Sequence, residues 1–183
     1  DGQWDFYWGK LLPPGFGDAE NKDRTLIGLP GSWTLTDHHP AFPAEGFATY
    51  RLRVHLDPSD AGWNTPRILA LRTTIIHSAF RLYANGQLVQ EVGRVAVEPG
   101  TSRADLVPRM HTFVVHGSDL ELILHVANYQ MDLGGILNPI RLGSVQSIRN
   151  DWPLSLTRDL CLLGASGIIS LYHLSLFLIR RRE

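Results

Sequence analysis

A run of polar side chains behind an apolar segment is the first candidate site for chemistry in this sequence. The pattern of residues 120–128 predicts a strand with Leu120, Leu122, Leu124 and Val126 on one face, and the run NYQMD at 128–132 ends it, directly ahead of a leucine and a pair of glycines. Amide, hydroxyl and carboxylate groups of this kind can fix the polar groups of a small ligand. The same residue types also suit an ordinary surface loop, so both interpretations stay open at this point.

Patterns for catalysis and for metal binding are weak. The carboxylates are scattered along the chain, and no Gly-x-Ser-x-Gly nucleophile motif precedes the C-terminal apolar run. His38 and His39 are adjacent but have no His or Cys partner at ligand spacing. We therefore expect this chain to contain no catalytic residue, to use no cofactor and to hold no metal ion.

The elements that would position such residues are short strands. In residues 48–56, Tyr50 and Leu52 fall on the face expected to meet a core, whereas Thr49, Arg51 and Arg53 fall on the face expected to meet solvent. Strand patterns of this kind recur between turn signals up to residues 140–142 and 145–148, with no amphipathic helix among them. This arrangement predicts an all-β, antiparallel β-sandwich.

Two local motifs support the prediction of a sandwich. Asn85-Gly86 joins two of the strand patterns and suits the positive φ angles of a type I′ turn, so a hairpin is expected there. Trp33 follows a Pro-Gly-Ser turn and is expected to anchor the core.

The C-terminal residues 160–179 carry no charge and are followed by three arginines. A helix of about 20 residues is about 30 Å long, which is the thickness of the hydrocarbon core of a bilayer. Because the arginines have no counterpart before the run, the positive-inside rule places the C-terminus in the cytoplasm and residues 1–158 outside it. The alternative is a buried core helix, but such helices rarely run this long without a charge.

Three polar residues fall on one face of this predicted span. Ser166, Ser170 and His173 lie at positions i, i+4 and i+7. A polar side chain that faces lipid is costly, so we expect this stripe to pack against other helices. The alternative is that a lone span tolerates three weakly polar residues.

Composition narrows the class of protein. The formal net charge is −1 and charged residues make up 19% of the chain, which is no electrostatic footprint for nucleic acid. The single cysteine, Cys161, lies in the apolar run, so residues 1–158 contain no disulfide. An extracytoplasmic domain without disulfides fits a bacterial periplasm better than a small secreted scaffold.

Five segments, taken in order, resemble a known domain. DGQWDFYWG, LPGSW, GFATYRLRVHL, FRLYANGQLV and LELILHVANY together resemble the sugar-binding jelly-roll domain of glycoside hydrolase family 2, over residues 1–129. No single motif is specific to this domain, but the five motifs in this order are stronger evidence for the resemblance than any one of them. The resemblance implies a jelly-roll sandwich like that of galactose-binding domains. It carries over no catalytic residues, because the acid pair of those enzymes lies in a separate barrel domain.

A sugar site needs an aromatic platform and polar groups that fix the hydroxyls of the sugar. The candidates in loops and at strand ends are Trp63, Arg94, His111, Asn128, Tyr129 and Asp132. A structural role is an alternative for each of them, since a lone tryptophan in a sandwich more often packs in the core or at an edge.

The rest of the chain is similar to a second family. The segment GGILNPIRLGS, followed by a span that ends in SLYHLSLFLIRRRE, is similar to bacterial seven-transmembrane receptors with diverse intracellular signalling modules. In that family an ectodomain precedes seven helices and a cytoplasmic kinase or nucleotide cyclase. The resemblance therefore implies that this chain is the sensor domain with the first transmembrane helix.

These inferences combine into one leading hypothesis. Residues 1–150 form an extracytoplasmic sensor domain, 151–159 a connector and 160–183 the first transmembrane helix with its cytoplasmic flank, in a bacterial inner membrane. The partners expected are the membrane and a small ligand, such as a carbohydrate. The alternative is a non-catalytic sugar-binding accessory module of a membrane-anchored glycoside hydrolase. A third possibility is that the domain senses no small molecule and instead contacts a partner protein or the second subunit of a homodimer.

Overall fold

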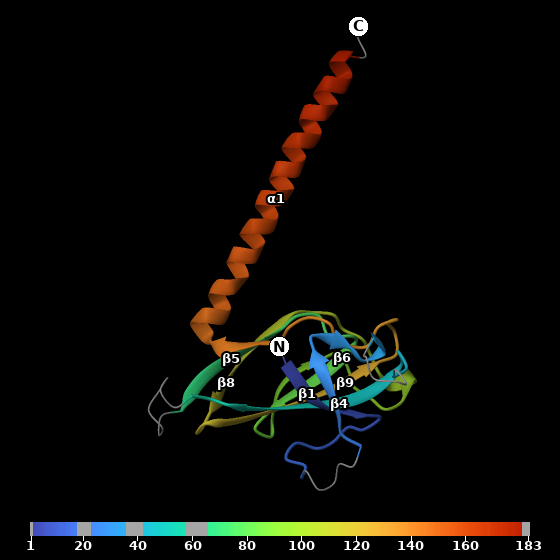
Figure 1. Ribbon diagram of the computed structural model, residues 1–183, viewed down its shortest axis with the longest axis vertical. Helices are drawn as coiled ribbons and strands as arrows, with labels where there is room; N and C mark the ends of the chain where they lie inside the picture. Colours follow the sequence, from blue (N-terminus) through green and yellow to red (C-terminus); the bar gives the residue numbers. More distant parts are fainter. Residues whose placement is uncertain (1, 18–22, 36–41, 58–65, 181–183) are drawn as a thin grey trace. The chain divides into compact units, whose positions relative to one another are not determined.

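The structure, a computed structural model, describes residues 2–17, 23–35, 42–57 and 66–180, and for residues 151–158 it describes the backbone alone. The chain forms two compact units, Asp1–Val145 and Gln146–Glu183. The first unit is built of antiparallel strands and the second is helical (Figure 1). Trp63, His38 and His39 lie outside the described residues.

The larger sheet of the first unit has six strands in the order β2-β1-β4-β9-β6-β7. Every pairing in it is antiparallel. Its strands are β1 (Gly2–Trp8), β2 (Thr25–Leu29), β4 (Gly46–His55), β6 (Ala79–Ala84), β7 (Gln87–Val92) and β9 (Asp119–Asn128).

A three-stranded sheet in the order β11-β5-β8 forms the opposite layer. Its strands are β5 (Arg67–Thr73), β8 (Arg109–Val115) and β11 (Arg141–Ser144). A short pair, β3 (Gly31–Ser32) and β10 (Gly135–Ile136), and the 3₁₀ turns Trp33–Leu35 and Pro99–Thr101 complete the unit. Leu71 and Val115 of the small sheet share one buried core with Leu124 of the large sheet, so the β-sandwich predicted from the sequence is confirmed.

Aromatic side chains fill one part of this core. Trp33 is fully buried, as expected, and its ring centroid lies 5.3 Å from that of Trp8. Its indole Nε1–H donates a hydrogen bond of 2.8 Å to the carbonyl oxygen of Pro43. A Cβ on Gly134 would lie 2.1 Å from Cζ2 of Trp33, so the backbone approaches the indole ring closely enough to require glycine there.

The expectation that Thr49 and Arg51 face solvent is wrong. Both are buried, although Arg53 on the same side of β4 is exposed. The segment of residues 10–17 covers this part of the outer face. The Leu12 N–H donates to Thr49 Oγ1 at 3.0 Å, and Thr49 Oγ1 donates to the Lys10 carbonyl oxygen at 2.7 Å.

Phe16 completes the cover. Its ring meets the Tyr7 ring edge-on at 5.3 Å and lies 4.6 Å from the guanidinium carbon of Arg51. The Arg51 Nε is 2.9 Å from a carboxylate oxygen of Glu121. An arginine can be buried under a loop here because a carboxylate and an aromatic face both meet its charge.

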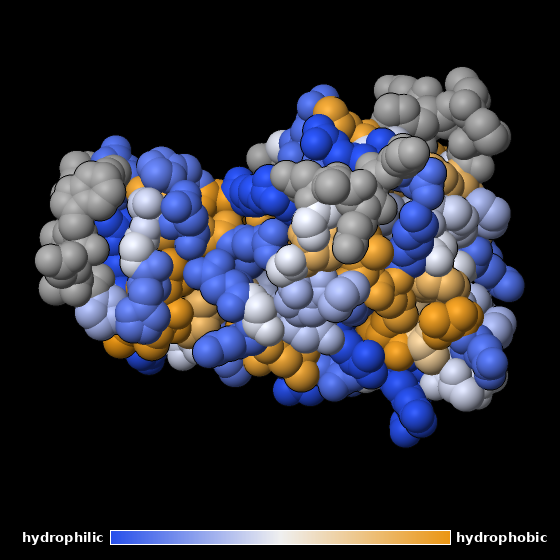
Figure 2. Space-filling model, turned by 90° about the horizontal axis from the view of Figure 1, so that it is seen from below, coloured by the Kyte–Doolittle hydropathy of each residue, from blue (hydrophilic) through white to orange (hydrophobic). Residues whose placement is uncertain are grey.

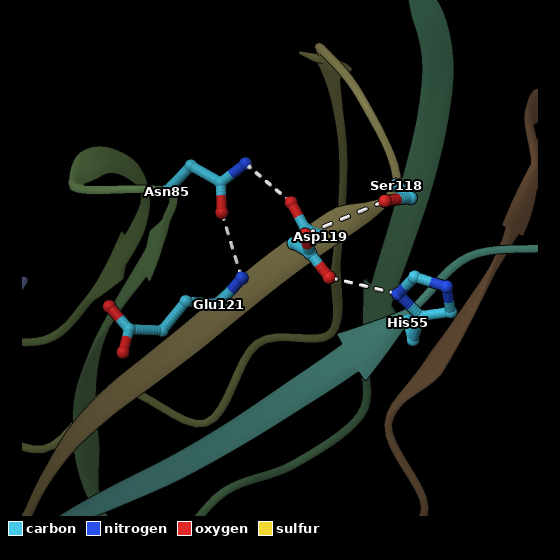
Figure 3. A network of polar contacts seen from close by, with 5 residues as sticks. All are labelled: His55, Asn85, Ser118, Asp119 and Glu121. Carbon is cyan, nitrogen blue, oxygen red and sulfur yellow. Dashed lines mark hydrogen bonds and ion pairs between the residues drawn. The ribbon is translucent and has the colours of Figure 1, made fainter. Parts of the chain in front are cut away.

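The hairpin predicted at Asn85-Gly86 is confirmed. The two residues have φ angles of 46° and 83° and join β6 to β7. The Asn85 side chain also fastens the turn to β9, because Nδ2 donates to the Asp119 carbonyl oxygen at 3.2 Å and Oδ1 accepts from the Glu121 N–H at 2.7 Å (Figure 3).

One helix, α1 (Val145–Arg180), makes up most of the second unit. The strand expected at residues 145–148 is therefore wrong, because β11 ends at Ser144 and the helix begins at the next residue. Within the described residues, Asp159–Arg180 is the one stretch long and apolar enough to cross a membrane, and its side chains are not buried. The sequence prediction of a C-terminal apolar helix is thus confirmed.

Candidate functional site

The end of β9 is tied to residues 93–105, which connect β7 to β8 and are called the 93–105 loop below. The Tyr129 hydroxyl donates a hydrogen bond to the Val97 carbonyl oxygen. Ser78 Oγ donates to Gln130 Oε1 at 3.0 Å, and the Asp105 N–H donates to the Ser78 carbonyl oxygen at 3.0 Å. Segments far apart in the sequence thus meet at this end of the large sheet.

Tyr129 is half-buried in this junction. Burial raises the pKa of its phenol, and the negative charge of Glu45 raises it further. The phenol therefore stays protonated and remains a hydrogen-bond donor at neutral pH, which suits its bond to the Val97 carbonyl oxygen.

Asn128 is fully buried, and its side chain is engaged inside the protein. Nδ2 donates to the carbonyl oxygens of Ala44 and Met131 at 2.9 and 2.7 Å, and Oδ1 accepts from the Met131 N–H at 3.1 Å. Through these bonds the Asn128 side chain stabilises the turn after β9. Asp132, at that turn, is exposed to solvent.

The 93–105 loop encloses a depression that we call the loop cavity, of about 930 Å³. Gly93, Arg94 and residues 100–105 line it. Gly93 has a φ of 69°, and a Cβ there would lie 2.4 Å from the Arg103 carbonyl oxygen. Glycine is needed at this position because the two arms of the loop run antiparallel almost in contact.

Hydrogen bonds inside the loop hold its shape. Ser102 Oγ donates to the Arg94 carbonyl oxygen at 3.1 Å, and Thr101 Oγ1 donates to the Glu98 carbonyl oxygen at 3.0 Å. The Ser102 N–H is 3.2 Å from the Glu98 carbonyl oxygen as well. A loop braced in this way is preorganised, so a ligand bound there would cost little loop-ordering entropy.

The candidates from the sequence are only partly brought together. Arg94 lines the loop cavity, and Tyr129 braces the same loop from outside. Asn128 and Asp132 are not among the residues that line it. His111 lies on β8 in the other sheet, opposite Leu71, and is exposed.

Sequence reasoning missed Arg103 and Asp105. Residues 98–108 show no periodicity, so no pattern pointed to them. The glycine at 93 within a strand-and-turn region was the available signal, because such a glycine often marks a close approach of two backbone segments.

A second polar cluster lies at the opposite end of β9 (Figure 3). His55 Nδ1 is 2.9 Å from Asp119 Oδ1, beside a depression of about 400 Å³ that Arg53, Asn85 and Glu121 also line. The hydrogen bonds of the Asn85 side chain and the Glu121 N–H hold the hairpin turn against β9. This cluster therefore has a structural task that accounts for its arrangement.

Polar residues in α1 can be placed individually. Ser170 Oγ donates to the Ser166 carbonyl oxygen at 2.8 Å, so its hydroxyl is satisfied within the helix. His173 meets the neighbouring Tyr172 ring at 5.5 Å between centroids. Of the described residues, no three His, Cys, Asp or Glu side chains are placed so as to hold a metal ion.

Hydrophobic side chains also reach the surface. On the face seen in Figure 2 they form patches separated by hydrophilic residues. Ile68 and Val114, partners across β5 and β8, are 63% and 51% exposed.

No family model and no curated protein matches the chain. Solved structures do match. A glycosyl hydrolase family 2 member from Bacteroides cellulosilyticus is 18% identical with a TM-score of 0.56, over 78% of this chain and 20% of that one. Beta-glucuronidase 2 from Bacteroides uniformis is 19% identical with a TM-score of 0.54, over 77% and 17%.

A family 2 beta-galacturonidase from Eisenbergiella tayi is 13% identical with a TM-score of 0.51, over 78% of this chain and 23% of that one. The chain therefore spans about a fifth of the length of these proteins. At such identities the similarity establishes the fold alone. The first unit has the fold of a β-sandwich domain found in family 2 glycoside hydrolases.

Proposed function

We propose that this chain is the extracytoplasmic sensor domain and first transmembrane helix of a bacterial membrane receptor, and that its sandwich binds a carbohydrate or a similar small polar ligand. The fold shared with domains of glycoside hydrolases supports the ligand class. The preorganised loop cavity supplies a place for the ligand. We propose that the chain itself is not catalytic.

The observation that carries the receptor proposal is the direct connection between the strands and the helix. β11 ends at Ser144 and α1 begins at Val145, and the helix then continues without a break to Arg180. We propose that α1 carries a displacement at its first turn along the helix to the apolar stretch. Ligand binding would shift the output if the two signalling states differ in ligand affinity.

The proposed topology follows from charge. The arginines 180–182 would lie in the cytoplasm and the sandwich in the periplasm of the inner membrane. We further propose that Ser166, Ser170 and His173 mark a face of α1 that packs on other helices, or on a second copy of the chain in a homodimer.

A non-catalytic accessory module of a membrane-anchored glycoside hydrolase is the second candidate. This candidate is favoured because the structural neighbours are glycoside hydrolases. The full gene product separates the two candidates: further apolar helices after residue 183 would support the receptor, and a barrel domain would support the hydrolase.

The ligand proposal can be tested on the whole 183-residue chain in lipid nanodiscs. Calorimetric titration with a panel of neutral and acidic monosaccharides should detect at least one saccharide ligand. Cys161 is the only cysteine of the chain and is exposed on α1, so a fluorescent label there would report whether binding reaches the helix. A panel without any binding saccharide, together with crosslinking to a partner protein, would overturn the carbohydrate proposal.

A further inference from the structure

Two arginines face each other across the 93–105 loop. Arg94 and Arg103 form an antiparallel bridge, in which the Arg94 N–H donates to the Arg103 carbonyl oxygen at 2.8 Å and the Arg103 N–H donates to the Arg94 carbonyl oxygen at 3.1 Å. Residues directly opposite in such a bridge project from the same face with Cβ atoms about 5 Å apart. Like charges in this position repel each other, so the pair destabilises the loop unless an anion lies between them.

Three other arginines of the sandwich are neutralised by the protein itself. Arg24, Arg51 and Arg81 lie 3.1, 2.9 and 2.7 Å from carboxylate oxygens. None of the ion pairs formed among the described residues includes Arg94 or Arg103, and both side chains are exposed. The guanidinium groups of this bridge are therefore available to an outside anion.

The loop cavity gives such an anion a defined place. Both arginines line it, together with Asp105, so its charged groups are two cations and one anion. Its volume of about 930 Å³ lies in the range of small-molecule sites. A guanidinium matches a carboxylate through two parallel N–H···O bonds, and Asp105 can accept hydrogen bonds from hydroxyl groups.

We propose that the 93–105 loop binds a saccharide that carries a carboxylate, with Arg94 and Arg103 holding the carboxylate and Asp105 accepting from sugar hydroxyls. This inference rests on the proposed function, in which the sandwich binds a carbohydrate. It adds the chemical class of the ligand and the residues that select it.

The test compares acidic and neutral sugars on the whole chain in nanodiscs. Galacturonate and glucuronate are titrated beside galactose, glucose and acetate, at low and at high salt. The variants are Arg94→Gln, Arg103→Gln, the double variant and Arg94→Lys, which keeps the charge but loses the planar fork. Arg109→Gln is the matched control, because it removes one exposed arginine that does not line the cavity.

We expect an acidic sugar to bind at least about tenfold more tightly than its neutral counterpart, and each glutamine variant to lose about tenfold or more, in line with charge-assisted hydrogen bonds. Arg94→Lys should lose less, and Arg109→Gln should bind like the wild type. Melting temperatures of the variants no lower than that of the wild type show that the fold is intact.

Two results would overturn the inference, and they can be told apart. If neutral and acidic sugars bound alike and the glutamine variants had no effect, the carboxylate proposal would fall while carbohydrate binding stood. If no saccharide bound at any concentration tested, whether or not acetate did, the proposed function would fall together with it.

Discussion

Removing the aromatic ring that covers the outer face of the large sheet should destabilise the sandwich. Phe16 is 6% exposed and lies between the Tyr7 ring and the Arg51 guanidinium. Burial of a phenylalanine side chain is worth about 1.5–3 kcal/mol. The edge-on contact with Tyr7 and the contact with Arg51 add about 1 kcal/mol each.

Together these terms amount to about 3.5–5 kcal/mol. Because a loop can relax around the gap, we expect Phe16→Ala to lower the free energy of unfolding by about 3 kcal/mol, near the lower end of the usual range. Phe16→Leu keeps most of the apolar area and loses the ring contacts, so its cost should be about 1–2 kcal/mol. Leu35→Ala, at a position 71% exposed, is the control and should stay within about 0.5 kcal/mol of the wild type.

Urea unfolding of the whole chain in mild detergent, followed by tryptophan fluorescence, measures all three values. A Phe16→Ala variant that is as stable as the Leu35→Ala control would refute the reasoning. Residues 10–17 would then not cover the sheet in solution, and another group would have to meet the charge of Arg51.

Three further predictions concern pH, packing and topology. Burial lowers the pKa of His125 below its usual 6.5, so as the pH falls the unfolded chain takes up the proton before the folded one does. The free energy of unfolding should therefore fall as the pH drops through about 6.5. This decrease should be absent from the urea midpoints of the His125→Gln variant. Gly134→Ala should lower the free energy of unfolding by about 1–3 kcal/mol or more, because its Cβ would overlap Trp33, whereas Gly28→Ala, which meets nothing within 4 Å, should cost less in the same assay. In a background in which Cys161 is replaced by serine, Val97→Cys, at a position 55% exposed, should react with a membrane-impermeant maleimide in intact spheroplasts; protection until the membrane is opened would contradict the proposed orientation.

Structural features that depend only on residues close together in the sequence could be predicted. Asn85-Gly86 supports a tight hairpin because these two residue types tolerate positive φ angles wherever they occur in the chain. The C-terminal helix was equally predictable, since a long uncharged run needs no partner from elsewhere in the sequence to be recognised. The sandwich itself followed from repeated alternation in polarity.

Features that depend on covering segments could not be predicted. Alternation along β4 placed Thr49 and Arg51 in solvent, but residues 10–17 fold over them and bury both. A period of two reports which residues share a face, not what lies above that face. The start of α1 was missed for a related reason, because the apolar residues at 145–148 are too few to tell a strand from the first turn of a helix.

The fold and the candidate site also differ in how far the sequence predicts them. The strand-rich fold, the hairpin and the apolar helix can be inferred from the sequence, because each depends on local spacing. The pairing of Arg94 with Arg103, the position of Asp105 beside them and the inward hydrogen bonds of Asn128 are visible only in the folded protein. These outcomes depend on where the two arms of a loop without periodicity pair beside Gly93 and on which strand end the loop is tied to. Such contacts are set by packing between segments far apart in the chain, and spacing along the chain does not record them.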